Sequence, residues 1–268
     1  MTKKIIISDV DGTLIGNDRK IPPEMKKLAA LIKANGIPFT IASGRIQSRI
    51  DELVKMLEIT LPVIGCNGAS AKLGDRYIWN TLIPPECLKE AVLLADSLGM
   101  SVVMTDGEKE YAFRKTPWIA DLMDNYGRYD GVRQPTQEEW KTEAIQKVLI
   151  DDSSKSGKID EVVELLQQHP DYISVVKYQS GTVDVMPANC SKGEAIKKLA
   201  EYLKVDMADI VAVGDHHNDI EMIETAGLGA AVANASADLK QIADYVCKNE
   251  LCAGVIEVVE KVINNGTI

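Results

Sequence analysis

The chain has 268 residues, 46% of them hydrophobic, which is enough to bury one large core or two modest ones. Its formal net charge is −10 and no run of lysine and arginine forms a basic tract, so nucleic-acid binding is disfavoured. No stretch approaches the ~20 apolar residues of a membrane span, and the N-terminal residues lead into a short strand rather than a long apolar leader, so we expect a soluble cytoplasmic protein.

The cysteines indicate neither a disulfide framework nor a zinc site. They are odd in number and lack the CxxC spacing of common zinc sites. We therefore expect reduced thiols at all five positions, which are Cys66, Cys87, Cys190, Cys247 and Cys252.

Two carboxylates follow directly on the first apolar run of the chain. Residues 5–7 are three isoleucines, which suit a strand buried on both faces, and Gly12 then permits a tight turn. Asp9 and Asp11 therefore lie at the carboxyl end of a predicted strand. That edge is where open α/β sheets bind their ligands.

Carboxylates separated by one residue repel each other unless a cation or a proton lies between them. Magnesium is the natural candidate, because it prefers hard oxygen ligands and often shares its site with a substrate phosphate. An aspartate can also attack phosphorus to form an aspartyl-phosphate, while the second carboxyl protonates the leaving oxygen and later deprotonates water. The alternative for this stretch alone is a plain turn, in which Asp-Gly is common.

A second polar turn is expected after the next strand. A helix that opens at residues 22–24 ends at Gly36, and residues 37–42 then form a buried strand whose exit delivers Ser43 and Gly44 to the same sheet edge as Asp9. A hydroxyl, a flexible glycine and the amides of a helix N-terminus can together hold phosphate oxygens. An ordinary N-cap is the alternative for Ser43.

The following segment is predicted as a helix and a hairpin. The helix covers residues 46–57, a short strand covers residues 62–66, and residues 77–80 form the second strand of the hairpin. The Asn67-Gly68 pair is typical of a hairpin turn.

The pattern changes at about residue 84 to mixed helices and strands. Helices are expected over residues 85–98, 117–126 and 158–169, and strands over residues 101–104, 110–114, 144–150, 173–178 and 182–186. Such a mixture reads as an α+β layer of its own. Short connections near residues 82–84 and 186–187 would let it hinge against the rest of the chain.

The chain then returns to a helix that starts at Lys192. A lysine near a helix N-terminus is unfavourable for the helix dipole. The placement is explained if the ammonium pairs with a phosphate or with the Asp9 carboxylate. A solvated surface lysine is the alternative.

A further buried strand is predicted over residues 210–213, and Asp215 leaves its carboxyl end as Asp9 leaves the first. Asp215 can thus complete a magnesium site. Asn218 and Asp219 follow at the start of the next helix. Asn218 can hydrogen-bond phosphate or Ser43, and Asp219 can bind the metal or orient its waters.

The C-terminal part is expected to finish the sheet. Residues 229–233 and 245–247 are predicted strands, the latter at the sheet edge. Helices are predicted over residues 237–243 and 255–263.

Four of these stretches resemble, in the same order, the four motifs of haloacid dehalogenase superfamily phosphatases. They are residues 9–13 (DVDGT), 41–45 (IASGR), 192–193 (KG) and 214–219 (GDHHND). Residues 67–69 (NGA) and the long insert between the second and third motifs are similar to the Cof-like subfamily, whose members carry an α/β cap. The resemblance covers essentially the whole chain.

The resemblance implies an α/β fold, with a Rossmann-like parallel sheet core and an inserted α+β cap of the C2B type. The core would comprise residues 1–83 and 187–268, and the cap residues 84–186, which would set substrate specificity. The implied activity is a Mg²⁺-dependent phosphatase for small phosphomonoesters, with sugar phosphates as the first guess and flavin mononucleotide-like compounds second. The expected partner is a small phosphorylated metabolite, with no nucleic acid or membrane.

The resemblance also assigns roles to residues of this chain. Asp9 is the expected nucleophile and Asp11 the general acid and base, which needs a raised pKa. The phosphate-binding residues are Ser43, Gly44, Lys192 and Asn218. The metal-binding residues are Asp9, Asp11 and Asp215, with Asp219 a ligand or a residue that orients metal-bound water. For Asp11, similar enzymes suggest that the backbone carbonyl contacts the metal more than the side chain does.

Three alternatives remain open from the sequence. A phosphomutase would return the phosphoryl group to a sugar and release no inorganic phosphate. A signalling receiver also clusters aspartates on a parallel sheet, but its phosphorylated aspartate belongs at a later strand and it needs no insert. A catalytically silent metabolite sensor is disfavoured by the intact set of Asp9, Asp11, Lys192 and Asp215.

Overall fold

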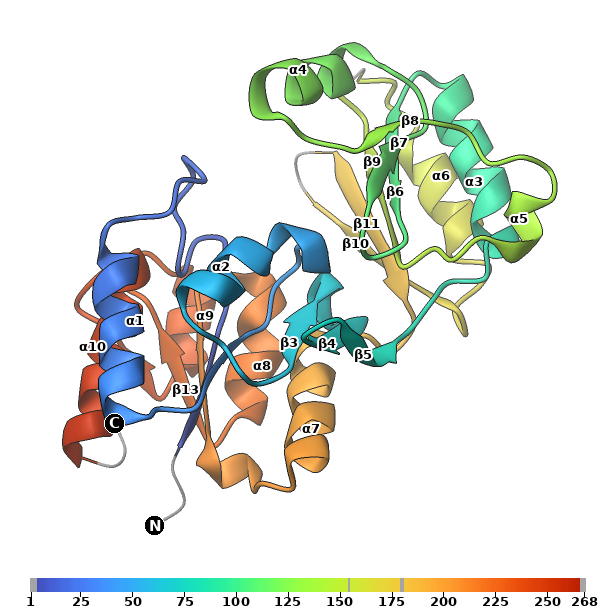
Figure 1. The fold of residues 1–268 in the computed structure, drawn as a ribbon. Helices are drawn as coiled ribbons and strands as arrows, with labels where there is room; N and C mark the ends of the chain where they lie inside the picture. Colours follow the sequence, from blue (N-terminus) through green and yellow to red (C-terminus); the bar gives the residue numbers. More distant parts are fainter. Residues whose placement is uncertain (1–3, 154, 179–180, 266–268) are drawn as a thin grey trace. The chain divides into compact units, whose positions relative to one another are not determined.

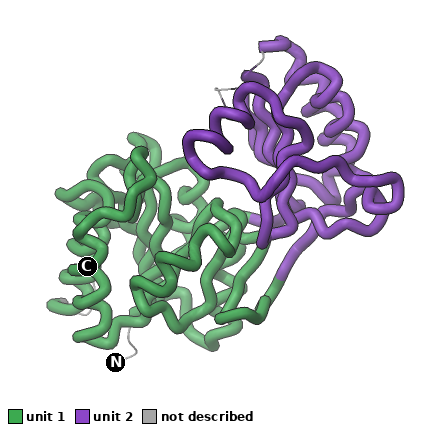
Figure 2. The backbone as a smooth tube through the Cα atoms, turned by 45° about the horizontal axis from the view of Figure 1, so that its top comes forward, with its two compact units in different colours: residues 1–79, 191–268 green, residues 80–190 purple. Residues whose placement is uncertain are grey.

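The computed structural model describes residues 4–153, 155–178 and 181–265 (Figure 1). This part of the chain divides into two compact units (Figure 2). Unit 1 runs up to residue 79 and resumes at residue 191, and unit 2 comprises residues 80–190. Each unit has its own cluster of buried apolar side chains.

Unit 1 is built on a parallel sheet with the strand order β14-β13-β12-β1-β2. Its strands are β1 (Ile5–Ser8), β2 (Phe39–Ile41), β12 (Ile210–Gly214), β13 (Leu228–Ala231) and β14 (Tyr245–Val246). Every residue of β1 and of β12 is buried, as expected for strands covered on both faces. Because β1 and β12 are neighbours, their carboxyl ends meet at one edge of the sheet.

The helices of unit 1 pack around this sheet. The α-helices are α1 (Glu24–Asn35), α2 (Asp51–Met56), α7 (Lys192–Leu203), α8 (Ile220–Thr225), α9 (Ala237–Ile242) and α10 (Leu251–Asn265). The short 3-10 helices are η1 (Gln47–Arg49), η3 (Met207–Asp209) and η4 (His217–Asp219). Helix α1 packs against α10 and helix α7 against α8, and their apolar side chains share one core with the strands (Figure 1).

A small antiparallel sheet follows α2 and differs from the predicted hairpin. Its strands, in the order β3-β4-β5, are β3 (Val63–Gly65), β4 (Ser70–Leu73) and β5 (Arg76–Asn80), with the 3-10 turn η2 (Cys66–Gly68) after β3. Cys66, Asn67 and Gly68 all have positive φ, so the chain reverses within three residues and Gly65 already pairs with Ser70. The prediction that residues 77–80 pair directly with β3 is therefore wrong, because β4 lies between them.

Two predicted helices differ most from the observed ones. The helix expected over residues 46–57 is divided into η1 and α2, because Ile46 is extended and Ile50 departs from ideal helical geometry. The last helix begins at Leu251, four residues before its predicted start. Leu251 has a φ of 51°. The apolar periodicity on which the prediction was based carries no information about such a backbone conformation.

Unit 2 contains a six-stranded sheet with the order β10-β11-β9-β6-β7-β8. Its strands are β6 (Ser101–Thr105), β7 (Glu110–Ala112), β8 (Gly131–Val132), β9 (Lys147–Asp151), β10 (Ile173–Lys177) and β11 (Thr182–Pro187). Among the described residues, the neighbouring strands of this sheet pair antiparallel, except that β7 and β8 are parallel. Its helices are α3 (Glu86–Ser97), α4 (Pro117–Tyr126), α5 (Glu139–Thr142) and α6 (Ile159–Leu166). The two-residue β8 and the four-residue α5 were not predicted, since such short elements leave no periodicity to read.

Helices cover both faces of the unit 2 sheet. Along β6, Val102 and Met104 join the apolar cluster of α3 and α6, whereas Val103 points to the other face and joins Ile119 of α4. Helices α3 and α6 lie side by side, as Figure 1 shows. This mostly antiparallel sheet and its helices form the α+β layer that the sequence pattern indicates. The parallel sheet of unit 1 confirms the α/β class of the core. In the described part of the chain no helix combines the length and the apolar character needed to cross a membrane.

The burial of α3 can be tested with two leucines on that helix. Leu88 is fully buried and Leu93 is 45% exposed. We expect Leu88→Ala to lower the free energy of unfolding by about 2–5 kcal/mol, because it leaves a cavity in the core of unit 2. Leu93→Ala is the matched control, with an expected change of less than about 0.5 kcal/mol. Urea-induced unfolding followed by circular dichroism measures both, and equal losses would contradict the observed orientation of α3.

Candidate active site

The neighbouring strands β1 and β12 bring Asp9 and Asp215 to one edge of the sheet. Ser8 pairs with Val213, and the Asp9 amide extends this ladder by donating to the Val213 carbonyl at 2.9 Å. Asp9 is 4% exposed and Asp215 is 8% exposed, so both carboxylates are largely removed from water. Residues more than 200 positions apart in the sequence thus meet because parallel strands end at the same edge.

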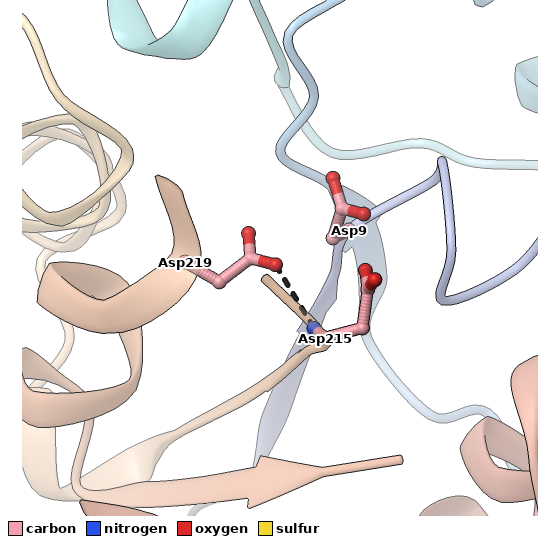
Figure 3. A group of neighbouring side chains, drawn as sticks. All are labelled: Asp9, Asp215 and Asp219. Atoms are coloured by element: carbon pink, nitrogen blue, oxygen red, sulfur yellow. Dashed lines mark hydrogen bonds between the residues drawn. The ribbon is translucent and has the colours of Figure 1, made fainter. Parts of the chain in front are cut away.

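A third carboxylate, that of Asp219, joins this pair. Ligand oxygens of Asp9, Asp215 and Asp219 all lie within 4.8 Å of one another, and Figure 3 shows the three carboxylates converging from separate parts of the chain. Asp219 Oδ2 accepts hydrogen bonds from the backbone amides of Asp215 at 2.9 Å and His216 at 3.1 Å. Gly214 makes this approach possible, since a Cβ there would lie 2.6 Å from the Asp219 Cβ.

Lys192 is the cation within the acidic cluster. It is the first residue of α7, whose N-cap Ser191 accepts a hydrogen bond from the Glu194 amide at 3.0 Å. Its fully buried ammonium donates to Asp9 Oδ1 and, at 2.6 Å, to Asp219 Oδ1. The unfavourable placement of Lys192 at the helix N-terminus is therefore compensated by two carboxylates, one of which is the Asp9 carboxylate that the sequence analysis considered.

The pKa values of the cluster reflect its burial and its surplus of negative charge. Burial raises the pKa of Asp9 well above its usual range, and the charges of Asp219 and Asp215 add to this effect, although Lys192 opposes it. The pKa of Asp215 is raised by burial and by Asp219, against the hydrogen bond from Thr13. Burial acts to lower the pKa of Lys192, but Asp219 and Asp9 outweigh it and hold the pKa above its usual value. We conclude that the Lys192 ammonium stays charged and is the positive partner of the buried carboxylates.

The donor set fits a hard divalent cation. Three carboxylates and one ammonium leave a net charge of −2 when all are ionised. All the donors are oxygens, which is the ligand type that Mg²⁺ prefers.

Gly12 and Thr13 support Asp215 from the turn after β1. The Thr13 hydroxyl donates to Asp215 Oδ1 at 2.8 Å, a contact that the sequence reasoning missed. Gly12 has a φ of 91°, and a Cβ there would lie 2.1 Å from Asp215 Oδ2, so the turn requires glycine. The hydroxyl two residues after Asp11 is the one signal in the sequence that could have indicated this support.

Asp11 lies apart from the acidic cluster, in a two-pronged ion pair with Arg45. Arg45 Nε donates to Asp11 Oδ2 at 2.8 Å and Arg45 Nη2 donates to Asp11 Oδ1 at 2.6 Å. Burial acts to raise the pKa of Asp11, but the hydrogen bonds and charge of Arg45 bring it below the usual value. The expected raised pKa is therefore wrong for this arrangement. The residue types alone did not indicate that Arg45 would select Asp11.

Ser43, Gly44 and Asn218 gather around Asn67. Ser43 is 1% exposed, its hydroxyl accepts from the Arg45 amide at 3.2 Å, and its carbonyl accepts from the Asn67 amide at 2.9 Å. Asn218 Nδ2 donates to Asn67 Oδ1 at 3.1 Å, so its side-chain partner is Asn67 and not Ser43. Gly44 also faces this side chain, because a Cβ there would lie 2.9 Å from Asn67 Oδ1. Asn67, with its left-handed φ of 50°, joins the second and fourth motifs.

Comparison with known proteins agrees with this site. The chain matches the haloacid dehalogenase-like hydrolases over residues 6–259. It is 27% identical to a phosphoglycolate phosphatase of Methanosarcina acetivorans over the full length of both chains. It is 26% identical to the 5-amino-6-(5-phospho-D-ribitylamino)uracil phosphatase YcsE of Bacillus subtilis, over 96% of this chain and 94% of that one.

A solved structure has the same fold. The structure of BT4131, described as a subclass IIB sugar phosphatase, matches with a TM-score of 0.78 at 21% identity, over 99% of this chain and 100% of that one. The four motifs therefore lie on the fold that their order led us to expect. The chain belongs to the haloacid dehalogenase-like hydrolases and is a phosphatase of that family.

Proposed function

We propose that this phosphatase is a cytoplasmic, Mg²⁺-dependent enzyme that hydrolyses small phosphomonoesters through an aspartyl-phosphate on Asp9. The observation that carries the proposal is the environment of the Asp9 carboxylate. Its Oδ1 accepts from the buried Lys192, whereas its Oδ2 accepts no hydrogen bond from the residues that the structure describes. One oxygen is thus held in place and the other is available as a nucleophile.

The reaction takes place in two displacements. In the first, Asp9 Oδ2 attacks phosphorus, the bond from phosphorus to the alcohol oxygen breaks, and the leaving oxygen takes a proton from Asp11. In the second, water attacks the aspartyl-phosphate, Asp11 takes the proton from that water, and the bond from phosphorus to Asp9 breaks to release inorganic phosphate. Each step conserves its protons within the pair of Asp11 and the reacting oxygen.

The ion pair with Arg45 prepares Asp11 for one of its two roles, that of the base. The ion pair with Arg45 favours the ionised carboxylate, which is the form that acts as a base toward water. To act as the acid of the first step, Asp11 has to exchange this guanidinium for a proton. An incoming phosphate competes for the same guanidinium, because arginine pairs equally well with phosphate and with carboxylate.

The cation would be held by the carboxylates of Asp9 and Asp215 together with the backbone carbonyl of Asp11. Asp219 would either bind it or orient its waters, since both of its oxygens already accept hydrogen bonds. When bound, Mg²⁺ supplies positive charge that offsets the negative charge of the phosphoryl group and of the buried carboxylates. Lys192, Ser43, Gly44 and Asn218 would bind the remaining phosphate oxygens.

We propose sugar phosphates as the first substrate class and flavin mononucleotide-like compounds as the second. The names of the relatives support small phosphomonoesters, since they include a phosphoglycolate phosphatase and a sugar phosphatase. The residues of the site address the phosphoryl group, so discrimination among leaving groups would belong to unit 2, acting as a cap. A panel of phosphomonoesters assayed with Mg²⁺ and scored by inorganic phosphate release tests both the activity and the ranking. Transfer of the phosphoryl group without phosphate release would instead identify a phosphomutase.

The nucleophile is tested by Asp9→Asn. An amide cannot form the aspartyl-phosphate, so we expect turnover to fall by about 10³-fold or more while the fold is retained. Asp75→Asn makes the same chemical change in an exposed turn and serves as the control, with turnover unchanged. Circular dichroism checks the fold of both variants, and near-normal phosphate release by Asp9→Asn would refute the assignment.

The metal site is tested by thermal unfolding with and without Mg²⁺. A ligand that binds only the folded protein stabilises it by about 2.7 kcal/mol at 100 times its Kd. We expect Mg²⁺ to raise the unfolding temperature of the wild-type protein, and Asp215→Asn to lose most of this shift. Sodium chloride at equal ionic strength is the control. An equal shift with sodium chloride, or an undiminished shift in the variant, would contradict the proposed ligands.

The role of the buried ammonium is tested by Lys192→Met, which keeps the length of the side chain and removes its charge. Because Asp9 and Asp219 would lose their buried partner, we expect a loss of about 3–5 kcal/mol in the free energy of unfolding at pH 8 without Mg²⁺. Lys197→Met, on the exposed face of the same helix, should leave the free energy of unfolding nearly unchanged. Urea titrations compare the free energies of unfolding of the two variants. Similar losses would show that the buried ion pairs of Lys192 stabilise the fold no more than an exposed one.

A further inference from the structure

We propose that Asn234 is a positioning residue for catalysis, which holds the Gly12 carbonyl and thereby the turn that carries Asp11 and Thr13. Asn234 belongs to none of the four motifs. The activity readout of this inference rests on the proposed function, whereas a second readout given below does not.

The side chain of Asn234 bridges two distant segments of unit 1. Its Nδ2 donates to the Gly12 carbonyl at 2.7 Å, and its Oδ1 accepts from the Leu251 amide at 2.9 Å. One end of the carboxamide acts as a donor and the other as an acceptor, so both contacts define its orientation. The bridge joins the turn after β1 to the first residue of α10.

The Gly12 carbonyl, which accepts this hydrogen bond from Asn234, lies where the turn is most constrained. Gly12 has a φ of 91° and stands so close to Asp215 that no side chain fits there. The carbonyl of Gly12 belongs to the peptide that leads into Thr13, whose hydroxyl donates to Asp215. A rotation of this peptide would therefore move Thr13 away from Asp215 and loosen the hydrogen-bonded turn of residues 10–15, to which Asp11 belongs. Asn234 opposes that rotation by holding the carbonyl.

Asn234 is itself held on both sides. The amide of Ala233 donates to the Asn249 carbonyl at 3.0 Å, and the amide of Ser236 donates to the Asp215 carbonyl at 2.8 Å. Asn249 is fixed in turn by Glu257 of α10, which accepts from its Nδ2 at 2.7 Å. A short path of hydrogen bonds thus runs from the last helix to the turn of the first motif.

A purely structural role would act at the other end of the bridge, where Asn234 satisfies the Leu251 amide. Two variants separate these roles. Asn234→Asp keeps an acceptor for Leu251 but places a carboxylate oxygen against the Gly12 carbonyl, whereas Asn234→Ala removes both contacts. If only the start of α10 matters, the aspartate variant behaves like the wild type. If the Gly12 carbonyl matters, both variants are impaired.

The first experiment measures kcat and KM for p-nitrophenyl phosphate at saturating Mg²⁺. We expect both variants to lower kcat by about 10- to 100-fold, the scale of a misplaced catalytic group, with KM changed by less than about threefold. Asn35→Asp is the matched control, because Asn35 is also exposed and its Nδ2 donates to a backbone carbonyl, that of Leu31, at 2.9 Å on α1. A wild-type kcat in Asn234→Asp would overturn the proposal.

The second experiment needs no substrate and no metal. Hydrogen–deuterium exchange of the peptide covering residues 10–15 reports the turn directly, since the amides of Gly12, Thr13 and Leu14 donate within it. We expect faster exchange in both Asn234 variants and no change in Asn35→Asp. Unchanged exchange in Asn234→Ala would overturn the proposal. If the wild-type protein released no phosphate, the proposed function would fail while this readout still decided the role of Asn234.

Discussion

The structure of unit 1 depends on one buried interaction, the contact of the Lys192 ammonium with Asp9 and Asp219. Carboxylates that are removed from water need a positive partner, because burying an unpaired ion is strongly destabilising. Lys192 provides that partner from the first turn of α7 and is fully buried there. Asp215 remains beside it, held by the hydroxyl of Thr13. One ammonium among three carboxylates leaves an imbalance that suits a divalent cation and a site for phosphate chemistry.

The residues at strand ends could be predicted from the sequence because a simple rule places them. Apolar runs identify β1 and β12, and parallel neighbours present their carboxyl ends together, so Asp9 and Asp215 had to be close if these strands were adjacent. Lys192 could be identified because a lysine is unfavourable at the start of a helix unless an anion lies nearby. In each case the physical reason is a property of a backbone element, namely the direction of a strand or the dipole of a helix. The sequence pattern indicates where these elements begin and end.

The contacts made across loops could not be predicted in this way. Arg45 pairs with Asp11 across two separate turns, and Asn67 accepts from the Asn218 side chain out of a turn with positive φ. Cys66 and Asn67 both have positive φ, a conformation that the residue types permit but do not require. The same angles reverse the chain early and create β4, which the periodicity of the sequence did not reveal. Contacts that depend on the reach of a side chain or on the geometry of a turn could therefore not be predicted from the sequence pattern.

The two places where the chain leaves unit 1 and returns to it lie beside residues of the site. Before leaving, Trp79 donates from its Nε1 to the Gly68 carbonyl at 3.0 Å, next to Asn67. On its return the chain enters Ser191, which caps the helix that begins with Lys192.

The segment that Trp79 contacts also touches the returning chain, because a Cβ on Gly68 would lie 2.1 Å from the Ser191 carbonyl oxygen. An insertion between adjacent chain ends leaves the host fold intact, so more than one hundred residues can enter here without disturbing the sheet. On the return, Ser191 is one residue from Lys192, a group that the proposed chemistry uses. The insert therefore re-enters unit 1 directly at the helix that carries this buried ammonium.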